Sequence, residues 1–184
     1  GESVIQPLRE LAQPVIDLSG PWPWLDLQSG FDALFPKGQL RYWKSRALAE
    51  LSAAAIDVIA DFAARRPSPL TDITVWHHGG AMSSVGETET AYAGRNAPFL
   101  VTGEASWTDP SQNDEAIAWG REFWDAMGQH STGGLYLNFP GFGEEKEELV
   151  KAGYGVNYDR LAALKAKYDP NNLFRMNLNI PPES

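Results

Sequence analysis

The sequence contains three histidines, whose imidazoles could bind a metal ion or transfer a proton. The stretch 72–78 (DITVWHH) has the β-branched and aromatic content of a strand. In a strand, Trp76 and His78 share one face and His77 takes the other. The adjacent histidines therefore cannot both bind one metal ion without distortion, and His130 is the only further imidazole. The sequence predicts no metal site.

His78 is instead a candidate for proton transfer, because an imidazole titrates near neutral pH. The alternative is a histidine that is hydrogen-bonded within the sheet and has no catalytic role. A second candidate region is the stretch 134–139 (GLYLNF), which is expected to form a short strand. It carries Tyr136 and Asn138, which a core strand does not need at alternate positions. While the strand stays regular, these two side chains face one way and Phe139 faces the other.

Several common kinds of active site find no support in the sequence. There is no cysteine, which excludes disulfides, thiol catalysis and thiolate metal sites. The serines near glycine, Ser29, Ser83 and Ser84, lack the G-x-S-x-G context of a hydrolase. No single predicted strand presents two carboxylates on one face, as a glycosidase site would need. Neither G-x-G-x-x-G nor G-x-x-x-x-G-K-[ST] occurs, so no cradle for a nucleotide phosphate is recognisable.

Charge and hydropathy limit the classes of partner. The formal net charge of -9 argues against nonspecific binding to nucleic acid or to an anionic membrane. No apolar run approaches the roughly 18 residues that span a bilayer, and no secretory signal is visible at the start. The 184 residues suit one core, and the 7 tryptophans can fill that core or line a pocket for a flat organic ligand. These properties argue against nucleic acid and an anionic membrane as partners, and a place in the core is the safer interpretation of the tryptophans.

The spacing of apolar residues predicts alternating helices and strands. Helices are expected at residues 2–12, 25–35, 47–65, 112–130, 145–153 and 156–168, and strands at residues 15–18, 39–46, 72–78, 98–107 and 134–139. Such alternation alone would suit a parallel α/β sheet, but the strands of parallel sheets are usually continuous apolar runs. Here they carry Arg41, Lys44, His78, Thr102 and Glu104. The predicted fold class is therefore α+β, an antiparallel sheet with helices packed on one face and a polar, ligand-facing other face.

The C-terminal quarter carries the most specific pattern of the chain. It reads Tyr136-x-Asn138, then Tyr154-Gly155-x-Asn157-Tyr158-x-Arg160-Leu161-x-x-Leu164-Lys165, then Tyr168-Asp169-Pro170-x-Asn172-x-Phe174-Arg175 and Asn179-Ile180. This pattern resembles the C-terminal signature of the berberine bridge enzyme-like FAD-linked oxidases, a family of vanillyl-alcohol oxidase-type flavoproteins. A weaker resemblance runs through Gly79-Gly80-Ala81, Thr90-Ala91-Tyr92, Arg95 and Trp107. It implies a substrate-binding domain over residues 1–133 and a C-terminal berberine-like segment, 134–184, that continues the same domain.

The resemblance implies an FAD-dependent oxidoreductase. Such an enzyme transfers a hydride from a small organic substrate to the flavin, with oxygen as the expected acceptor. It also implies that an N-terminal flavin domain of the same protein holds the FAD. That domain is absent from this sequence, so the chain is expected to be a fragment and inactive alone. The alternative is a non-catalytic small-molecule-binding or structural module.

The resemblance also assigns roles to particular residues. In several members a carboxylate that can act as base sits at the position of Trp76, and in others a proton-abstracting tyrosine sits at the position of Phe139. Both positions are apolar here. The base is therefore His78 or Tyr136, or comes from the flavin domain, or the substrate needs little base help. Tyr136 and Asn138 are expected against the flavin ring; the alternative is that both side chains only form hydrogen bonds with neighbouring loops. The expected lining of the substrate pocket is Tyr42, Trp43, Trp76, His78 and Phe139.

Two further motifs in this segment are interpreted structurally. In Tyr168-Asp169-Pro170-Asn171-Asn172, the residue before proline leaves the helical region, which ends the helix. The glutamates Glu144, Glu145, Glu147 and Glu148 lie at a predicted helix start, where the helix dipole favours negative charge. Most of these carboxylates should point to water, so they make a poor metal site.

Overall fold

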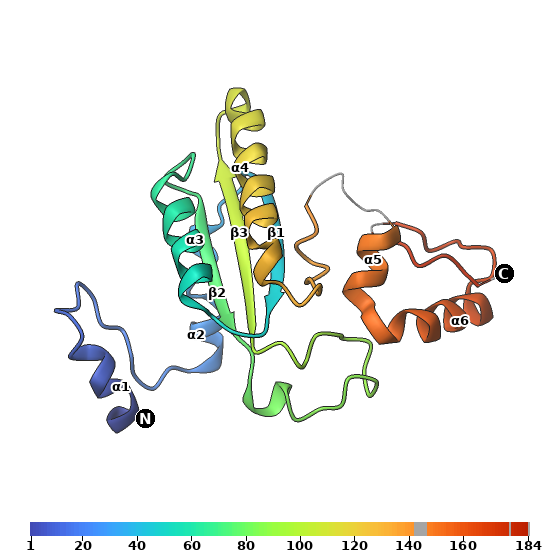
Figure 1. Cartoon of the computed structure of the whole chain (residues 1–184), viewed down its shortest axis with the longest axis horizontal. Coiled ribbons are helices and arrows are strands. Elements are labelled where there is room, and N and C mark those ends of the chain that lie inside the picture. The colour runs from blue at the N-terminus through green and yellow to red at the C-terminus, as the bar shows by residue number, and fades with distance from the viewer. Residues whose placement is uncertain (142–146, 177, 184) are drawn as a thin grey trace. The chain divides into compact units, whose positions relative to one another are not determined.

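The computed structural model describes residues 1–141, 147–176 and 178–183 (Figure 1). The contacts within the chain divide it into two units, residues 1–37 and residues 38–184. Within the described residues, no helix combines the length and the apolar character needed to cross a bilayer. The predicted division at residue 133 separates two parts of the second unit and stays a prediction.

The N-terminal unit, residues 1–37, consists of short helices without a core of their own. They are α1 (Glu2–Arg9), α2 (Trp24–Ser29) and a 3-10 turn (Asp32–Leu34). None of the residues in this unit is buried. The strand predicted at residues 15–18 is not formed, because Asp17 accepts hydrogen bonds from Arg9 Nε at 2.6 Å and from Ser19 N at 2.9 Å. These bonds hold the backbone in a local turn.

The second unit is built on a three-stranded antiparallel sheet, with strand order β1-β3-β2. The strands are β1 (Leu40–Leu48), β2 (Asp72–His77) and β3 (Phe99–Trp107). The central strand β3 pairs Thr102 with Ser45 of β1 and with Thr74 of β2, which sets the register of all three. Residues opposite one another in this register share a face of the sheet. The predicted α+β class and antiparallel sheet are confirmed.

Two helices cover one face of the sheet, α3 (Ala53–Ala64) and α4 (Asn113–Ala126) (Figure 1). A 3-10 turn, Met127–His130, continues α4. The helix predicted at 47–65 begins later than expected, because β1 extends to Leu48 and Ser52 caps α3. The Ser52 Oγ accepts the Ala55 N–H at 3.2 Å, which satisfies one free donor at the helix start.

The main core lies between these helices and the sheet. Its buried members are Tyr42, Leu48, Ala55, Phe62, Val101, Ala105, Trp107, Ala116, Trp119, Phe123 and Met127. At its centre Phe123 of α4 packs over Gly103 of β3, where an added Cβ would lie 2.5 Å from the phenyl ring. Glycine at this position therefore lets α4 approach the sheet closely.

The segment 131–140 lies along the free edge of β1 but is not the predicted strand 134–139. It pairs with the edge only at isolated points: the Ala47 N–H donates to Gly134 O at 3.0 Å, and the Tyr136 N–H donates to the Ser45 hydroxyl at 2.9 Å. A turn then closes with a 2.9 Å bond from Phe139 N to Tyr136 O. The Ser45 hydroxyl thus accepts one hydrogen bond that a backbone carbonyl would accept in a regular sheet. The turn then ends the extended conformation, so side chains no longer alternate between two faces.

The C-terminal segment adds helices α5 (Glu147–Tyr154) and α6 (Tyr158–Tyr168), with a small core of Val150, Tyr158 and Ala162. Of the predicted acidic cluster, Glu147 and Glu148 lie in the first turn of α5, and Glu144 and Glu145 lie outside the described residues. At the end of α6, Asp169 pairs with Lys165 and accepts the N–H groups of Leu173 and Phe174 at 2.7 and 3.0 Å. As predicted, this motif ends the helix.

Candidate functional site

The face of the sheet opposite α3 and α4 presents polar and aromatic side chains in rows. One row joins Trp43, Glu104 and Asp72 across the strands, the next joins Ser45, Thr102 and Thr74, and the third joins Ala47, Leu100 and Trp76. The alternation of side chains along a strand places Trp43 and Ser45 on one face and Tyr42 and Lys44 on the other. The register confirms that division, and we call this surface the open face.

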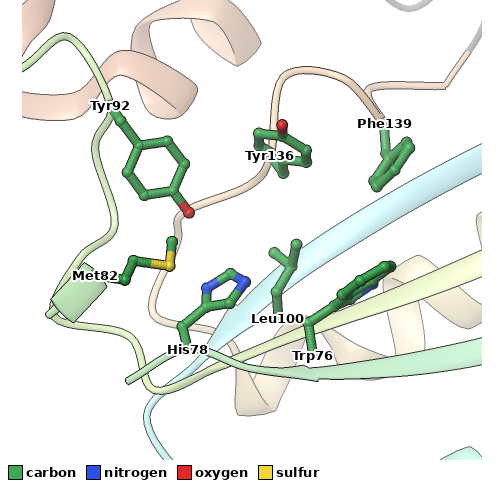
Figure 2. Close-up of a pocket in the computed structure, with 7 residues that line it drawn as sticks. All are labelled: Trp76, His78, Met82, Tyr92, Leu100, Tyr136 and Phe139. Atoms are coloured by element: carbon green, nitrogen blue, oxygen red, sulfur yellow. The ribbon is translucent and has the colours of Figure 1, made fainter. Parts of the chain in front are cut away.

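A cavity of about 300 Å³ lies at one end of the open face (Figure 2). Its lining residues are Trp76, His78, Met82, Tyr92, Leu100, Tyr136 and Phe139. They come from four parts of the second unit: strand β2 and the residue that follows it, the long connection from β2 to β3, strand β3, and the segment beside β1. Four predicted site residues, Trp76, His78, Tyr136 and Phe139, are thus brought together.

His78 directs its imidazole into this cavity (Figure 2). Its backbone N–H donates to Pro98 O at 2.7 Å, which continues the pairing of β2 with the β3 side of the sheet. Burial lowers the pKa of His78, and the neighbouring His77 lowers it further. His77 itself lies on the helix side, 5.2 Å from Phe99 between ring centroids. The imidazole of His78 is therefore neutral at neutral pH and can accept a proton.

Tyr136 and Phe139 lie on the same side of their segment, and the prediction that they face opposite ways is wrong. The turn between them brings their ring centroids to 5.4 Å in an edge-to-face contact. Asn138 is exposed, and its Nδ2 donates to the Tyr136 hydroxyl at 2.6 Å. Since this contact uses the tyrosine oxygen as acceptor, the hydroxyl proton stays available for a ligand.

The two remaining predicted pocket residues differ in outcome. Trp43 lies on the open face, with its ring centroid 5.4 Å from that of Phe139, so it borders the cavity through that ring. Its Nε1 donates to the Ser106 hydroxyl at 3.3 Å. Tyr42 does not line the cavity: it is 2% exposed and packs against Gly120 of α4 in the main core. The prediction for Tyr42 is wrong because neighbouring strand residues point to opposite faces.

Three lining residues, Leu100, Met82 and Tyr92, were not predicted. Leu100 belongs to β3, whereas Met82 and Tyr92 come from the connection between β2 and β3. Arg95 holds the conformation of this connection: its Nη1 donates to Met82 O at 2.9 Å and its Nη2 to the Thr90 hydroxyl at 2.7 Å. Burial raises the pKa of Tyr92, and Tyr136 raises it further, so this hydroxyl keeps its proton at neutral pH. The weak Thr90-Ala91-Tyr92 resemblance was the one available signal.

The C-terminal segment also forms hydrogen bonds with the connection between β2 and β3. The side chain of Asn157, which is 3% exposed, donates from Nδ2 to Glu87 O at 2.9 Å. Arg160 donates from Nη1 to Thr88 O at 3.2 Å. Both residues belong to the C-terminal pattern found in the sequence. That pattern therefore supports the loop that carries Tyr92.

A pair of carboxylates on the open face was also not predicted as a site. Asp72 of β2 lies directly opposite Glu104 of β3, and Glu104 is 6% exposed. Burial raises the pKa of both side chains, and repulsion from Asp72 raises that of Glu104 further. No single strand carries both residues, so only the register brings them together.

The fold is an α+β domain with a small, largely apolar cavity at one end of the sheet face opposite α3 and α4. Residues 135–181 match the family model described as "Berberine and berberine like". The berberine bridge enzyme-like resemblance is thus confirmed, and the matched segment supplies two lining residues of the cavity, Tyr136 and Phe139.

Relatives along the rest of the chain agree with this family. The chain is 40% identical over 104 residues to the uncharacterized FAD-linked oxidoreductase YvdP of Bacillus subtilis strain 168, covering 56% of this chain and 23% of that protein. It is 35% identical over 172 residues to the FAD-linked oxidoreductase dpmaF of Metarhizium anisopliae, covering 89% of this chain and 32% of that protein. These relatives are FAD-linked oxidoreductases, and the chain spans about a quarter to a third of their lengths.

A solved structure shares the fold over the whole chain. The structure of BBE-like 28 from Arabidopsis thaliana superposes with a TM-score of 0.79 at 21% sequence identity, covering 100% of this chain and 45% of that one. At this identity the likeness concerns the fold. The shared fold includes the sheet and the helices that cover it.

Proposed function

We propose that this chain forms the substrate-binding and C-terminal part of an FAD-dependent oxidoreductase that transfers a hydride from a small organic substrate to the flavin, with oxygen as the final acceptor. The cavity carries this proposal. Its lining joins Tyr136 and Phe139 of the matched segment to Trp76 and His78 of the sheet, so the family pattern and the candidate chemistry meet at one place.

The open face and the cavity rim fit a flat heteroaromatic ring. Trp76 is 47% exposed, and Tyr136 with Asn138 offers a hydroxyl and an amide beside apolar surface. We propose that Tyr136 and Asn138 lie against the flavin. The sequence has no phosphate cradle, which supports a further proposal: a flavin domain elsewhere in the same protein holds the rest of FAD.

The residues of the cavity support acid–base assistance to this reaction. Bound FAD supplies the hydride acceptor. When an alcohol or amine carbon loses a hydride, its oxygen or nitrogen must also lose a proton. The neutral imidazole of His78 can take that proton, and the Tyr136 hydroxyl can hold the same substrate atom by a hydrogen bond. Trp76, Leu100 and Phe139 provide apolar walls against which the substrate is oriented.

The composition of the lining favours a particular kind of substrate. Five of the seven lining side chains are aromatic or imidazole rings, and Met82 and Leu100 add apolar surface. A cavity of about 300 Å³ is at the small end of ligand pockets. We therefore propose a small alcohol or amine with an apolar or aromatic ring.

Flavin content and flavin reduction test the proposal. The full polypeptide that carries this chain should be yellow, and its flavin absorption should bleach on anaerobic mixing with a substrate from a panel of aromatic and aliphatic alcohols and amines. Admitting oxygen should restore the colour and release hydrogen peroxide. The 184-residue chain alone should be colourless. A full polypeptide that binds members of the panel but contains no flavin would instead favour a non-catalytic binding module.

A further inference from the structure

A buried hydrogen-bond network links the wall of the cavity to Glu104. The Trp76 Nε1–H donates to the Thr102 hydroxyl at 3.3 Å, and that hydroxyl lies 2.6 Å from Glu104 Oε1. The same hydroxyl lies 3.4 Å from Thr74 O. Thr102 is 0% exposed and Glu104 is 6% exposed, so these groups must satisfy one another. Trp76 lines the cavity, whereas Glu104 does not and is connected to Trp76 through Thr102.

Every hydrogen-bonding group in this network has a partner in either protonation state of Glu104. A threonine hydroxyl has one proton to donate and can accept two hydrogen bonds. When Glu104 is ionised, Thr102 donates to it and accepts from Trp76. When Glu104 is neutral, its carboxyl proton is donated to Thr102, whose own proton turns to Thr74 O. Only a hydroxyl hydrogen has to rotate between the two states.

The charged neighbours of Glu104 on this face are few and lie on both adjoining strands. Asp72 of β2 is directly opposite and disfavours a second negative charge. On β1 the directly opposite residue is Trp43, and Arg41 lies on the same face. The guanidinium of Arg41 is 5.8 Å from the centroid of the Trp43 ring. Burial and Asp72 favour the neutral carboxyl, while the hydroxyls of Thr102 and Thr74 favour the ionised form.

We propose that Glu104 is a positioning residue: through Thr102 it orients the Trp76 indole in the cavity wall, and gain or loss of its proton changes how firmly that indole is held. In the ionised state, Thr102 donates to a negative group, which polarises its oxygen and strengthens the bond from Trp76. In the neutral state, the same oxygen accepts two bonds at once, and each is weaker. The consequence for substrate binding rests on the proposed function, whereas the network itself does not.

The indole N–H resonance of Trp76 tests the network without any turnover. It is followed by ¹⁵N NMR against pH in the full polypeptide labelled at tryptophan, and assigned by its loss in Trp76→Phe. The resonance should titrate with a midpoint above 4.5, the ordinary value for glutamate. Glu104→Gln and Thr102→Val should each abolish the titration, and Asp72→Asn should move its midpoint to lower pH. A resonance that does not change with pH, or that still titrates in Glu104→Gln, would overturn the proposal.

Substrate kinetics then test the consequence. Loss of one hydrogen bond that orients the wall should raise KM by up to about tenfold in Thr102→Val, while kcat stays close to the wild-type value. A fall in kcat with unchanged KM would contradict a positioning role. If the polypeptide contains no flavin but the Trp76 resonance titrates through Glu104, the proposed function fails and the positioning network stands.

Discussion

The two faces of the three-stranded sheet use the same strands for opposite purposes. On the helix side, Val101, Gly103 and Ala105 of β3 contact a closed apolar core. On the open face, the intervening residues Thr102 and Glu104 are just as buried but polar, and the nearby Trp76 is 47% exposed. A core needs only apolar volume, whereas buried polar groups need specific partners. The helix side therefore provides stability, and the open face carries the proposed chemistry.

The largest expected effect separates the two faces by stability. Phe123→Ala on the helix side removes a ring that is 2% exposed and packs on Gly103, and should cost about 3–5 kcal/mol of unfolding free energy. Phe139→Ala on the open face should cost about 1 kcal/mol or less, because its ring borders a cavity. Urea unfolding followed by circular dichroism measures both. Equal losses would mean that the open face also contributes to the core.

The second largest effect is expected on activity, where the two faces are compared through the neighbouring residues His77 and His78. His78→Asn should lower kcat about 100-fold, because the cavity loses its proton acceptor. His77→Asn is the matched control, since His77 lies on the helix side beside Phe99. It should leave kcat near the wild-type value. Comparable losses in both variants would remove His78 from the proposed chemistry.

The pH profile sharpens this test. The pKa of His78 is lowered from 6.5, so the imidazole stays neutral at neutral pH, and kcat should fall as the pH drops through that lowered value. The unfolded state binds the proton more readily than the folded state. The contribution of His78 to stability is therefore present above its unfolded pKa and declines as the pH falls below it. His78→Asn should lose the acid limb of the rate profile, and a retained limb would point to another base.

A smaller effect is expected at the rim of the cavity. Asn138→Ala removes the amide that donates to Tyr136 at 2.6 Å but leaves the ring in place. The rate of flavin reduction should fall about tenfold, as expected for the loss of one orienting hydrogen bond. Stopped-flow absorbance measures the rate, and Asn96→Ala removes an exposed amide outside the cavity lining as the control. An unchanged rate in Asn138→Ala would remove both Asn138 and its contact from the site.

Local pattern was enough to predict which face of a strand a residue takes, but not where a segment stops being a strand. Alternation placed Trp43 and Tyr42 on opposite faces, and the assignment of Tyr42 to the pocket failed because it ignored that rule. The segment 134–139 has the composition of a strand, yet Ser45 replaces one backbone partner and a turn follows. A hydrogen bond to a side chain in place of a backbone group depends on tertiary contacts, so the local sequence does not indicate it.

Residues joined only by register were beyond prediction. Asp72 and Glu104 are 32 positions apart in the sequence, and a shift of one residue in the pairing of β2 with β3 would place them on opposite faces. Tyr92 likewise depends on Arg95 and on Asn157 from the C-terminal segment. The antiparallel sheet was predictable, because polar residues on the strands require a solvated or ligand-facing surface. Its register was not.

The smallest effect concerns that carboxylate pair. Directly opposed like charges destabilise an antiparallel pair, so Asp72→Asn should raise the unfolding free energy at neutral pH by about 0.2–1 kcal/mol. The pKa values of Asp72 and Glu104 are both raised, so the folded state binds protons more readily than the unfolded state. The stability of the wild type should therefore decline as the pH rises from the ordinary carboxyl range through these raised values.

Asp72→Asn should make that decline shallower, and its advantage over the wild type should vanish in acid, where both carboxyls hold protons. Asp57→Asn on the exposed side of α3 is the matched control and should leave the stability at neutral pH close to that of the wild type. Urea unfolding over a range of pH measures all three proteins. If Asp72→Asn is instead less stable than the wild type at neutral pH, the carboxylate of Asp72 has a favourable partner on the open face, and repulsion from Glu104 does not dominate its contribution to stability.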